Sequence, residues 1–149
     1  MVANCRDIGE ANQVVPCTSV SVESLSALMV DAYRGTLDWE DGDDESVAEA
    51  EIRATLNGKY GIFLADASGV ILDGGANVVS ALFASNFEGR ATILFVYTSK
   101  RAAGRGMASR LIRNAAYQLN EMGFEEVSLF VSDGNPAREL YERLGFEEK

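Results

Sequence analysis

The chain of 149 residues contains no histidine. Imidazole is the commonest general acid–base group and metal ligand near neutral pH, so chemistry that depends on histidine is excluded. The two cysteines, Cys5 and Cys17, are too few for a structural zinc site, which needs four ligands. We therefore expect no metal centre in this protein.

Long apolar runs are also missing. No stretch approaches the roughly 18 apolar residues of a membrane-spanning helix, and the first residues carry no signal-peptide pattern. We therefore expect a cytoplasmic protein with no membrane partner and with free thiols. With 47% hydrophobic residues, no repeats and no linker, residues 1–149 predict a single domain.

The net charge is −10, against which one basic cluster stands out. The cluster comprises Lys100, Arg101, Arg105, Arg110 and Arg113. Because an acidic protein is a poor ligand for duplex nucleic acid, the cluster indicates one phosphate-bearing ligand and no nucleic-acid partner. The acidic remainder either attracts a cationic acceptor such as an amine or only keeps the protein soluble.

The central stretch, residues 93–122, predicts a strand, a loop and a helix. The run Ile93–Tyr97 is β-branched and aromatic enough for a buried strand. After the loop, apolar residues form one helical stripe: Met107, Leu111, Ile112, Ala115, Leu119 and Met122. The first backbone N–H groups of such a helix have no intrahelical acceptor, and the helix dipole adds partial positive charge there.

The loop itself has the pattern R-x-x-G-x-G, at Arg101, Gly104 and Gly106. The glycines allow close approach to the backbone, and Arg101 and Arg105 add full charges, which predicts a pyrophosphate cradle. A Walker loop would need Gly-Lys-Ser/Thr, and a dinucleotide fingerprint would need a third glycine; neither is present. The alternative is an ordinary strand–helix turn with surface arginines.

The C-terminal stretch predicts another strand and helix. Residues 127–131 alternate as a strand, and Asp133-Gly134 forms a turn. Asn135 then caps a helix that has Pro136 at its first position and ends at Gly145.

Together the two motifs resemble the GNAT superfamily of acetyl-coenzyme A-dependent N-acetyltransferases. R-x-x-G-x-G follows a buried strand, and an N…A-x-x-L-Y-x-x-x-G-F pattern follows roughly thirty residues later. The second motif comprises Asn135, Ala137 or Arg138, Leu140, Tyr141, Gly145 and Phe146. The resemblance is strong from Ala91 onward and only architectural before it.

The resemblance implies an α/β (α+β) GNAT fold, with a mixed, mostly antiparallel sheet flanked by helices. The elements expected upstream are strands at 13–20, 60–65 and 78–85, helices from Ser21 or Ser24 to Gly35 and at 46–56, and a strand or connection at 70–72. The strands at 93–97 and 127–131 should run parallel and splay apart, with the pantetheine arm in the gap. The C-terminal strands are short or missing, because the chain stops at Lys149. Either the final strand is minimal, or a partner subunit contributes it, or the acceptor cleft is unusually open. A missing edge strand would leave the edge of the sheet exposed, which would favour a homodimer.

The implied activity moves an acetyl group from acetyl-CoA to a primary amine, by direct attack in a ternary complex. The residues expected to hold the pyrophosphate are Arg101, Ala103, Gly104, Arg105, Gly106, Met107 and Ala108. A backbone N–H in the strand at Val96, Tyr97 or Thr98 polarises the thioester. Asn135 contacts pantetheine unless it is only a helix cap. Tyr141 protonates the departing thiolate unless it is only a core tyrosine.

In many family members a glutamate on the central strand acts as the general base, but residues 93–98 of this chain contain no acid. The remaining acids considered are Glu88, Glu40, Asp41, Asp43 and Asp44, and none is singled out. Trp39 and Tyr33 either line the acceptor pocket or edge the core. The acceptor is a small-molecule or peptide amine of unspecified identity. The alternatives are a non-catalytic module that binds acetyl-CoA or CoA as a signal, and a phosphate-ligand binder unrelated to acyl transfer.

Overall fold

A computed structural model describes residues 1–36 and 44–148 and contains a seven-stranded sheet in the order β1-β7-β6-β5-β4-β2, with β3 paired to β5. The strands are β1 Val2–Asn4, β2 Val15–Pro16, β3 Ile62–Phe63, β4 Gly69–Leu72, β5 Val78–Phe87, β6 Arg90–Thr98 and β7 Glu126–Leu129. All described pairings are antiparallel except β6 with β7. The expected mixed, mostly antiparallel sheet is confirmed.

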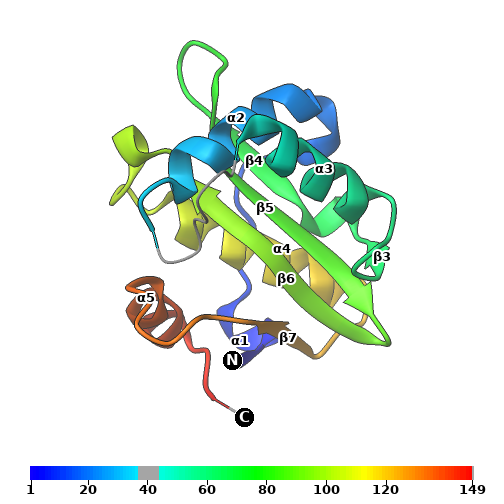
Figure 1. Ribbon diagram of the computed structural model, residues 1–149. Coiled ribbons are helices and arrows are strands. Elements are labelled where there is room, and N and C mark those ends of the chain that lie inside the picture. The colour runs from blue at the N-terminus through cyan, green and yellow to red at the C-terminus, as the bar shows by residue number, and fades with distance from the viewer. Residues whose placement is uncertain (37–43, 149) are drawn as a thin grey trace.

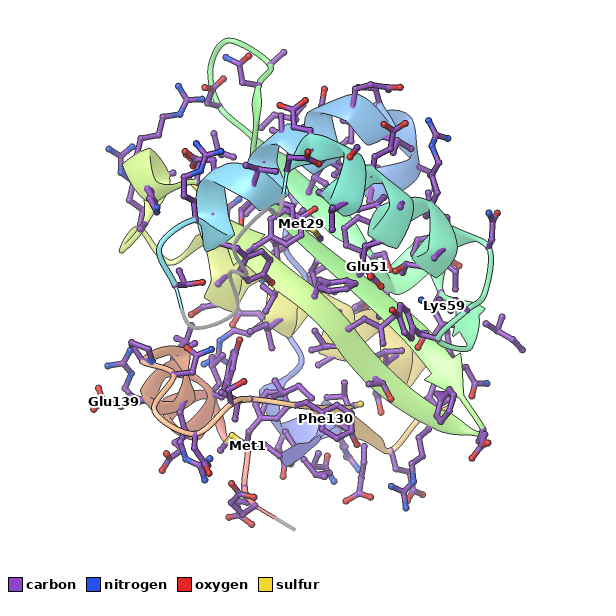
Figure 2. All side chains as sticks on the ribbon, in the orientation of Figure 1. Met1, Met29, Glu51, Lys59, Phe130 and Glu139 are labelled. Atoms are coloured by element: carbon purple, nitrogen blue, oxygen red, sulfur yellow. The ribbon has the colours of Figure 1, made fainter. Side chains whose placement is uncertain are left out.

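Helices cover both faces of this sheet (Figure 1). They are α1 Cys5–Ile8, α2 Val22–Tyr33, α3 Glu45–Leu56, α4 Met107–Glu121 and α5 Ala137–Leu144, with short 3-10 turns η1 Cys17–Ser19, η2 Ala65–Ala67 and η3 Lys100–Ala102. One core lies between the sheet and α4 with α1, and a second lies under α2 and α3. Figure 2 shows Met29 of α2 and Glu51 of α3 on the sides of their helices that face the sheet.

The long helices begin and end where local chemistry dictates. The Ser21 hydroxyl accepts the N–H of Ser24 at the start of α2, and Gly35, with φ +80°, follows its end. The Asp44 carboxylate accepts two N–H groups at the start of α3. The apolar stripe of α4 is buried at Leu111, Ile112, Ala115 and Leu119, as expected. Met122, also expected in the stripe, follows the end of the helix and is 39% exposed.

A β-bulge divides β6 into two parts. Phe83 pairs with Phe95 and Ala84 with Ile93, so Leu94 is an extra residue on β6. One extra residue reverses the alternation of a strand. Ala91 and Ile93 therefore pack in the α4 core, whereas Phe95 and Tyr97 pack on the α2 side.

The first half of the chain departs from the sequence expectation. The strand expected at 13–20 shrinks to β2, because Pro16 cannot donate to a ladder and η1 follows at once. The strand expected at 60–65 shrinks to β3, while 70–72 belongs to a true strand, β4. Neither β1 nor α1 was expected.

The expected exposed edge beyond β7 does not exist. β1 pairs antiparallel with β7, from Val2 opposite Ser128 to Asn4 opposite Glu126. On its other side, Val2 exchanges two backbone hydrogen bonds with Glu147, both 2.8 Å long. The C-terminal segment thus contributes one isolated bridge, and the chain's own N-terminal strand covers β7. The terminal strand at this end of the sheet is β1 and not β7, and the homodimer stays a prediction.

The described residues include no candidate membrane span and no candidate metal site. Within residues 1–36 and 44–148, no helix is long and apolar enough to cross a membrane. In the same ranges no group of three or more Cys, Asp or Glu side chains is placed to hold a metal ion. Cys5 and Cys17 are both buried and form no disulfide.

Candidate active site

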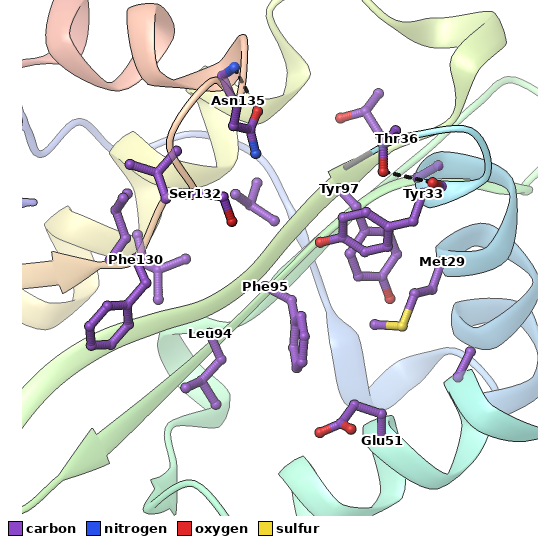
Figure 3. Close-up of a pocket in the computed structure, with 18 of the residues that line it drawn as sticks. Met29, Tyr33, Thr36, Glu51, Leu94, Phe95, Tyr97, Phe130, Ser132 and Asn135 are labelled. Carbon is purple, nitrogen blue, oxygen red and sulfur yellow. Dashed lines mark hydrogen bonds between the residues drawn. The ribbon is translucent and has the colours of Figure 1, made fainter. Parts of the chain in front are cut away.

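A cleft of about 1250 Å³ opens where β6 and β7 separate. The two parallel strands pair only from Ala91 opposite Val127 to Ile93 opposite Leu129. Beyond that point the cleft lies between the rest of β6 and residues 129–136, with α2 and α3 as its other wall (Figure 3). This volume lies above the range of about 300–1,000 Å³ that is typical of small-molecule sites.

The backbone of β6 offers hydrogen-bonding groups to this cleft. Ser99 N–H donates to Val79 O, at 2.8 Å, in the register that pairs Ser80 with Thr98. In an antiparallel pair such bonds recur at every second residue. The backbone N–H of Tyr97 therefore points toward β5, while those of Val96 and Thr98 point away from it. Because β7 has departed there, Val96 and Thr98 direct their N–H groups toward the cleft.

The Tyr97 side chain belongs to the core under α2. It is 4% exposed, and its hydroxyl donates to Leu25 O at 3.2 Å. Its ring lies 5.7 Å from that of Tyr33 and stacks on that of Phe83 at 6.3 Å. Burial above all, then the neighbouring Tyr33 and Cys17, raises the pKa of Tyr97 well above its ordinary value.

The loop before α4 forms an open row of donors. Gly104 and Gly106 have φ of +79° and +76°, and a Cβ at either position would meet nothing within 4 Å. In the described part of the chain, the backbone N–H groups of residues 104–109 donate to no acceptor, and the first helical bond runs from Arg110 N–H to Gly106 O. Six unbonded donors at the positive end of a helix dipole suit a bound anion.

Two arginines flank this row of donors. The guanidinium of Arg101 pairs with Asp73 at 3.2 Å and is largely exposed. Hydrogen bonds from Asn77 N–H and Gly75 N–H lower the pKa of Asp73, and Arg101 contributes further. Arg105 is exposed and forms no ion pair with any residue the structure describes.

Other members of the basic cluster hold the fold together. The ammonium of Lys100 donates to Arg34 O at the end of α2, and its backbone N–H donates to Asp31 at 3.1 Å. Arg113 donates to Ile8 O at 3.1 Å and so ties α4 to α1. The sequence pattern grouped these cations with the arginines of the loop, but the structure gives them different partners.

Tyr141 and Asn135 line the cleft from the side of α5. Tyr141 is 8% exposed and packs edge to face on Phe146, with ring centroids 6.1 Å apart. The Asn135 Oδ1 accepts the N–H of Ala137 at 2.9 Å. Asn135 thus bonds the start of α5 as expected, but the N-cap position is Pro136 and the helix begins at Ala137, one residue later than expected. That hydrogen bond leaves the side-chain amide nitrogen of Asn135 directed toward the cleft (Figure 3).

The opposite wall contains residues that the motifs did not indicate. Glu51 of α3 and Tyr60 line the cleft, facing Leu94 and Phe95 of β6. Phe130, just after β7, is 92% exposed at its mouth. The spacing of α3 was the available signal for Glu51, because it lies three residues after the buried Ala48 and beside the buried Ile52.

The acids proposed as a base fall into three groups. Asp44 lines the cleft, but its carboxylate is engaged in capping α3, where Oδ1 accepts from Ser46 N–H at 2.9 Å and Val47 N–H at 3.1 Å. Glu88 lies in the β5–β6 turn, at the other end of β6 from the cleft. The remaining candidates lie outside the described residues: Glu40, Asp41 and Asp43, together with Trp39. Tyr33 lines the cleft from the end of α2.

Comparison with known proteins gives one family and many structural neighbours. The family model described as "Acetyltransferase (GNAT) family" matches residues 23–146. No curated protein matches the chain.

Three solved structures illustrate the likeness of fold. The aminoglycoside 6′-N-acetyltransferase AAC(6′)-Ig from Acinetobacter haemolyticus has TM-score 0.68 and 18% identity, over 92% of each chain. The aminoglycoside N-acetyltransferase AAC(6′)-Iy in complex with CoA has TM-score 0.68 and 16% identity, over 91% of this chain and 88% of that one. A transcriptional regulator from Bacillus halodurans C-125 has TM-score 0.63 and 24% identity, over 91% of this chain and 92% of that one.

Proposed function

The chain belongs to the GNAT acetyltransferase family, and we propose that it transfers the acetyl group of acetyl-CoA to a primary amine. Both substrates occupy the cleft between β6 and the segment after β7, and the amine attacks directly. Acetyl-CoA supplies the acetyl group as a thioester. The proposal includes the single domain and the cytoplasmic location expected from the sequence.

The loop before α4 binds the pyrophosphate. The unbonded N–H groups of residues 104–109 provide the donors, and the positive φ of Gly104 and Gly106 turns the backbone toward the ligand. Arg101 and Arg105 add charge from the rim. Met107 and Ala108 take part through their backbone N–H groups, whereas the side chain of Met107 packs against the core. The expected role of Ala103 is corrected, because its N–H donates to Lys100 O at 3.4 Å and is not one of the unbonded donors.

The strand β6 and helix α5 act on the thioester. A backbone N–H aimed into the cleft stabilises the negative charge that develops on the carbonyl oxygen, and the register favours Val96 over Tyr97 for this task, with Thr98 next along the strand. Tyr141 donates its proton to the departing sulfur. The side-chain oxygen of Asn135 accepts a hydrogen bond from α5, and its side-chain amide nitrogen contacts the pantetheine.

The observation that carries the proposal is the row of unbonded N–H groups at residues 104–109, in the loop that follows β6, whose last residue Thr98 lines the cleft. Its test is calorimetric titration with acetyl-CoA of the wild type and of Gly104→Glu. A glutamate about 5 Å from the pyrophosphate would cost about 1–3 kcal/mol for each negative charge, so the affinity falls at least about tenfold. Gly89→Glu is the matched control, because Gly89 also has a positive φ and open space but lies in the β5–β6 turn.

Retained affinity in Gly104→Glu would refute this placement of the pyrophosphate. A folded wild type that binds no acetyl-CoA would refute the function itself. The alternative function is a module that binds acetyl-CoA or CoA as a signal, and the absence of an acid from residues 93–98 favours it. Tight binding without thiol release, across a panel of amines, would establish that alternative.

A further inference from the structure

The inner stripe of α3 brings one carboxylate into the cleft. Asp44, Val47, Ala48 and Glu51 line it at the three- and four-residue spacing of one helical face. Glu49 lies on another face and pairs with Arg53 at 2.7 Å. Figure 3 shows the Glu51 carboxylate directed toward the side of the cleft formed by Leu94 and Phe95.

One oxygen of Glu51 is already fixed in place. The Tyr60 hydroxyl donates to Glu51 Oε1, and among the described residues none donates to Oε2. This hydrogen bond is the largest cause that raises the pKa of Tyr60, so Tyr60 keeps its proton and remains the donor. The carboxylate is thereby oriented with one oxygen still able to accept.

The surroundings of Glu51 favour a cation. The described lining residues include no lysine or arginine, and Asp44 is the other acid among them. Lys59 lies over the Tyr60 ring, 5.2 Å from its centroid, and forms no ion pair with any described acid. An aromatic ring near a carboxylate further stabilises an ammonium group, and Phe95 is placed to do so.

We propose that Glu51 binds the ammonium group of the acceptor and accepts its proton. The inference rests on the proposed function and supplies from α3 the acid that β6 lacks. Glu51 faces the bulge at Leu94, just beyond the point where β6 and β7 part, so it lies across the cleft from the backbone that handles the thioester. Tyr60 is a positioning residue that acts through Glu51.

The protons and electrons balance as follows. The acceptor ammonium gives one proton to the Glu51 carboxylate, which later passes it to solvent. The freed lone pair forms the C–N bond as the C–S bond breaks, and Tyr141 protonates the departing sulfur. The nitrogen loses its second proton on forming the amide, and that proton restores the Tyr141 hydroxyl. The net products are the amide, the free thiol and one proton.

The side chains around Glu51 indicate which class of amine the cleft prefers. A primary alkylamine is cationic at neutral pH and pairs with Glu51. Its apolar body packs against Met29 and Phe95, and Phe130 meets it at the mouth of the cleft. Phenylethylamine is a suitable probe, and aniline, which is uncharged at neutral pH, is its matched neutral counterpart.

The experiment compares Glu51→Gln with wild type in steady-state turnover of both probes at saturating acetyl-CoA. Loss of a general base costs about 10²–10⁴-fold, so kcat/KM for phenylethylamine should fall at least about 100-fold. The value for aniline should change by less than about threefold, because no ammonium has to be bound or deprotonated. Glu49→Gln, the same substitution on the outer face of α3, should leave both values unchanged.

Calorimetry separates this inference from the proposed function. Acetyl-CoA should bind Glu51→Gln as it binds wild type. If wild type acetylates phenylethylamine and Glu51→Gln does so equally well, the role of Glu51 is refuted and the function stands. If wild type turns over neither amine, the inferred acceptor class is refuted, and the catalytic function itself is then decided by the wider panel of amines. Phenylethylamine is then titrated into the CoA complex, where equal binding to both proteins would refute the ammonium site and binding lost in Glu51→Gln would sustain it.

Discussion

Two tyrosines in this cleft should respond in opposite ways to loss of the hydroxyl. In Tyr97→Phe the change removes a buried hydrogen bond to Leu25 O but leaves the stacked ring in place. One such bond is worth about 1 kcal/mol, so the melting temperature should fall by about 2–4 °C in a chain of this length. Because only backbone groups of β6 serve the reaction, kcat should stay within about twofold of wild type.

In Tyr141→Phe the aromatic packing on Phe146 is kept while the proton donor is lost. The departing thiolate then takes its proton from water, and kcat should fall at least about 100-fold, which corresponds to about 2.7 kcal/mol of barrier. The KM for acetyl-CoA should change little, since the pyrophosphate contacts are untouched. Circular-dichroism melting and a thiol-release assay on both variants measure the four quantities.

A Tyr141→Phe variant that keeps kcat within about twofold of wild type would show that Tyr141 does not protonate the departing thiolate. Tyr141 would then be a core tyrosine of α5, as the sequence also allowed. A large loss of kcat in Tyr97→Phe with an unchanged melting temperature would contradict the assignment of that side chain to the core.

Three further outcomes follow from the contacts described above. Burial raises the pKa of the Cys5 thiol to about 11 and that of the Cys17 thiol to about 12, so both thiols stay protonated at pH 8. Both should therefore react with a disulfide reagent only after unfolding, as a time course with and without denaturant would show. Asp73→Asn keeps the side-chain oxygen that accepts from Gly75 N–H but removes the charge that pairs with Arg101. Acetyl-CoA should then bind about two- to fivefold more tightly at low salt, and calorimetry should show this gain disappear at about 1 M salt. Val2→Pro removes an N–H that bonds to the C-terminal segment and should destabilise the chain by about 2–3 kcal/mol in denaturant unfolding, whereas unchanged stability would show that β1 contributes little.

The sequence predicted most accurately the parts whose cause is local. The central stripe of α4, the cap of α2 and the glycines of the loop before α4 all act within a few residues, so the pattern locates them. The cap of α3 was not predicted, because Asp44 was considered only as a possible base. The splay of β6 from β7 followed from the resemblance and is confirmed by pairing that ends at Ile93 and Leu129.

Features with distant causes escaped prediction. β1 is a strand only because β7 and Glu147 pair with its three residues. The bulge at Leu94 depends on its register with β5, which the letters of β6 alone do not fix. Glu51 was one acid among several on α3, and only the fold shows that it faces the cleft and accepts from Tyr60.

The pairing of β1 with β7 also bears on how a growing polypeptide acquires this structure. Met1 and Leu129 are hydrogen-bonded although they lie 128 positions apart, so this contact closes one of the longest loops in the chain. Closure over such a length costs roughly 4 kcal/mol in its length-dependent part, which makes it a late step. Until β1 docks, the edge of β7 is open and can recruit a strand from another molecule, so the late closure of this contact is the step at which misassembly competes with folding.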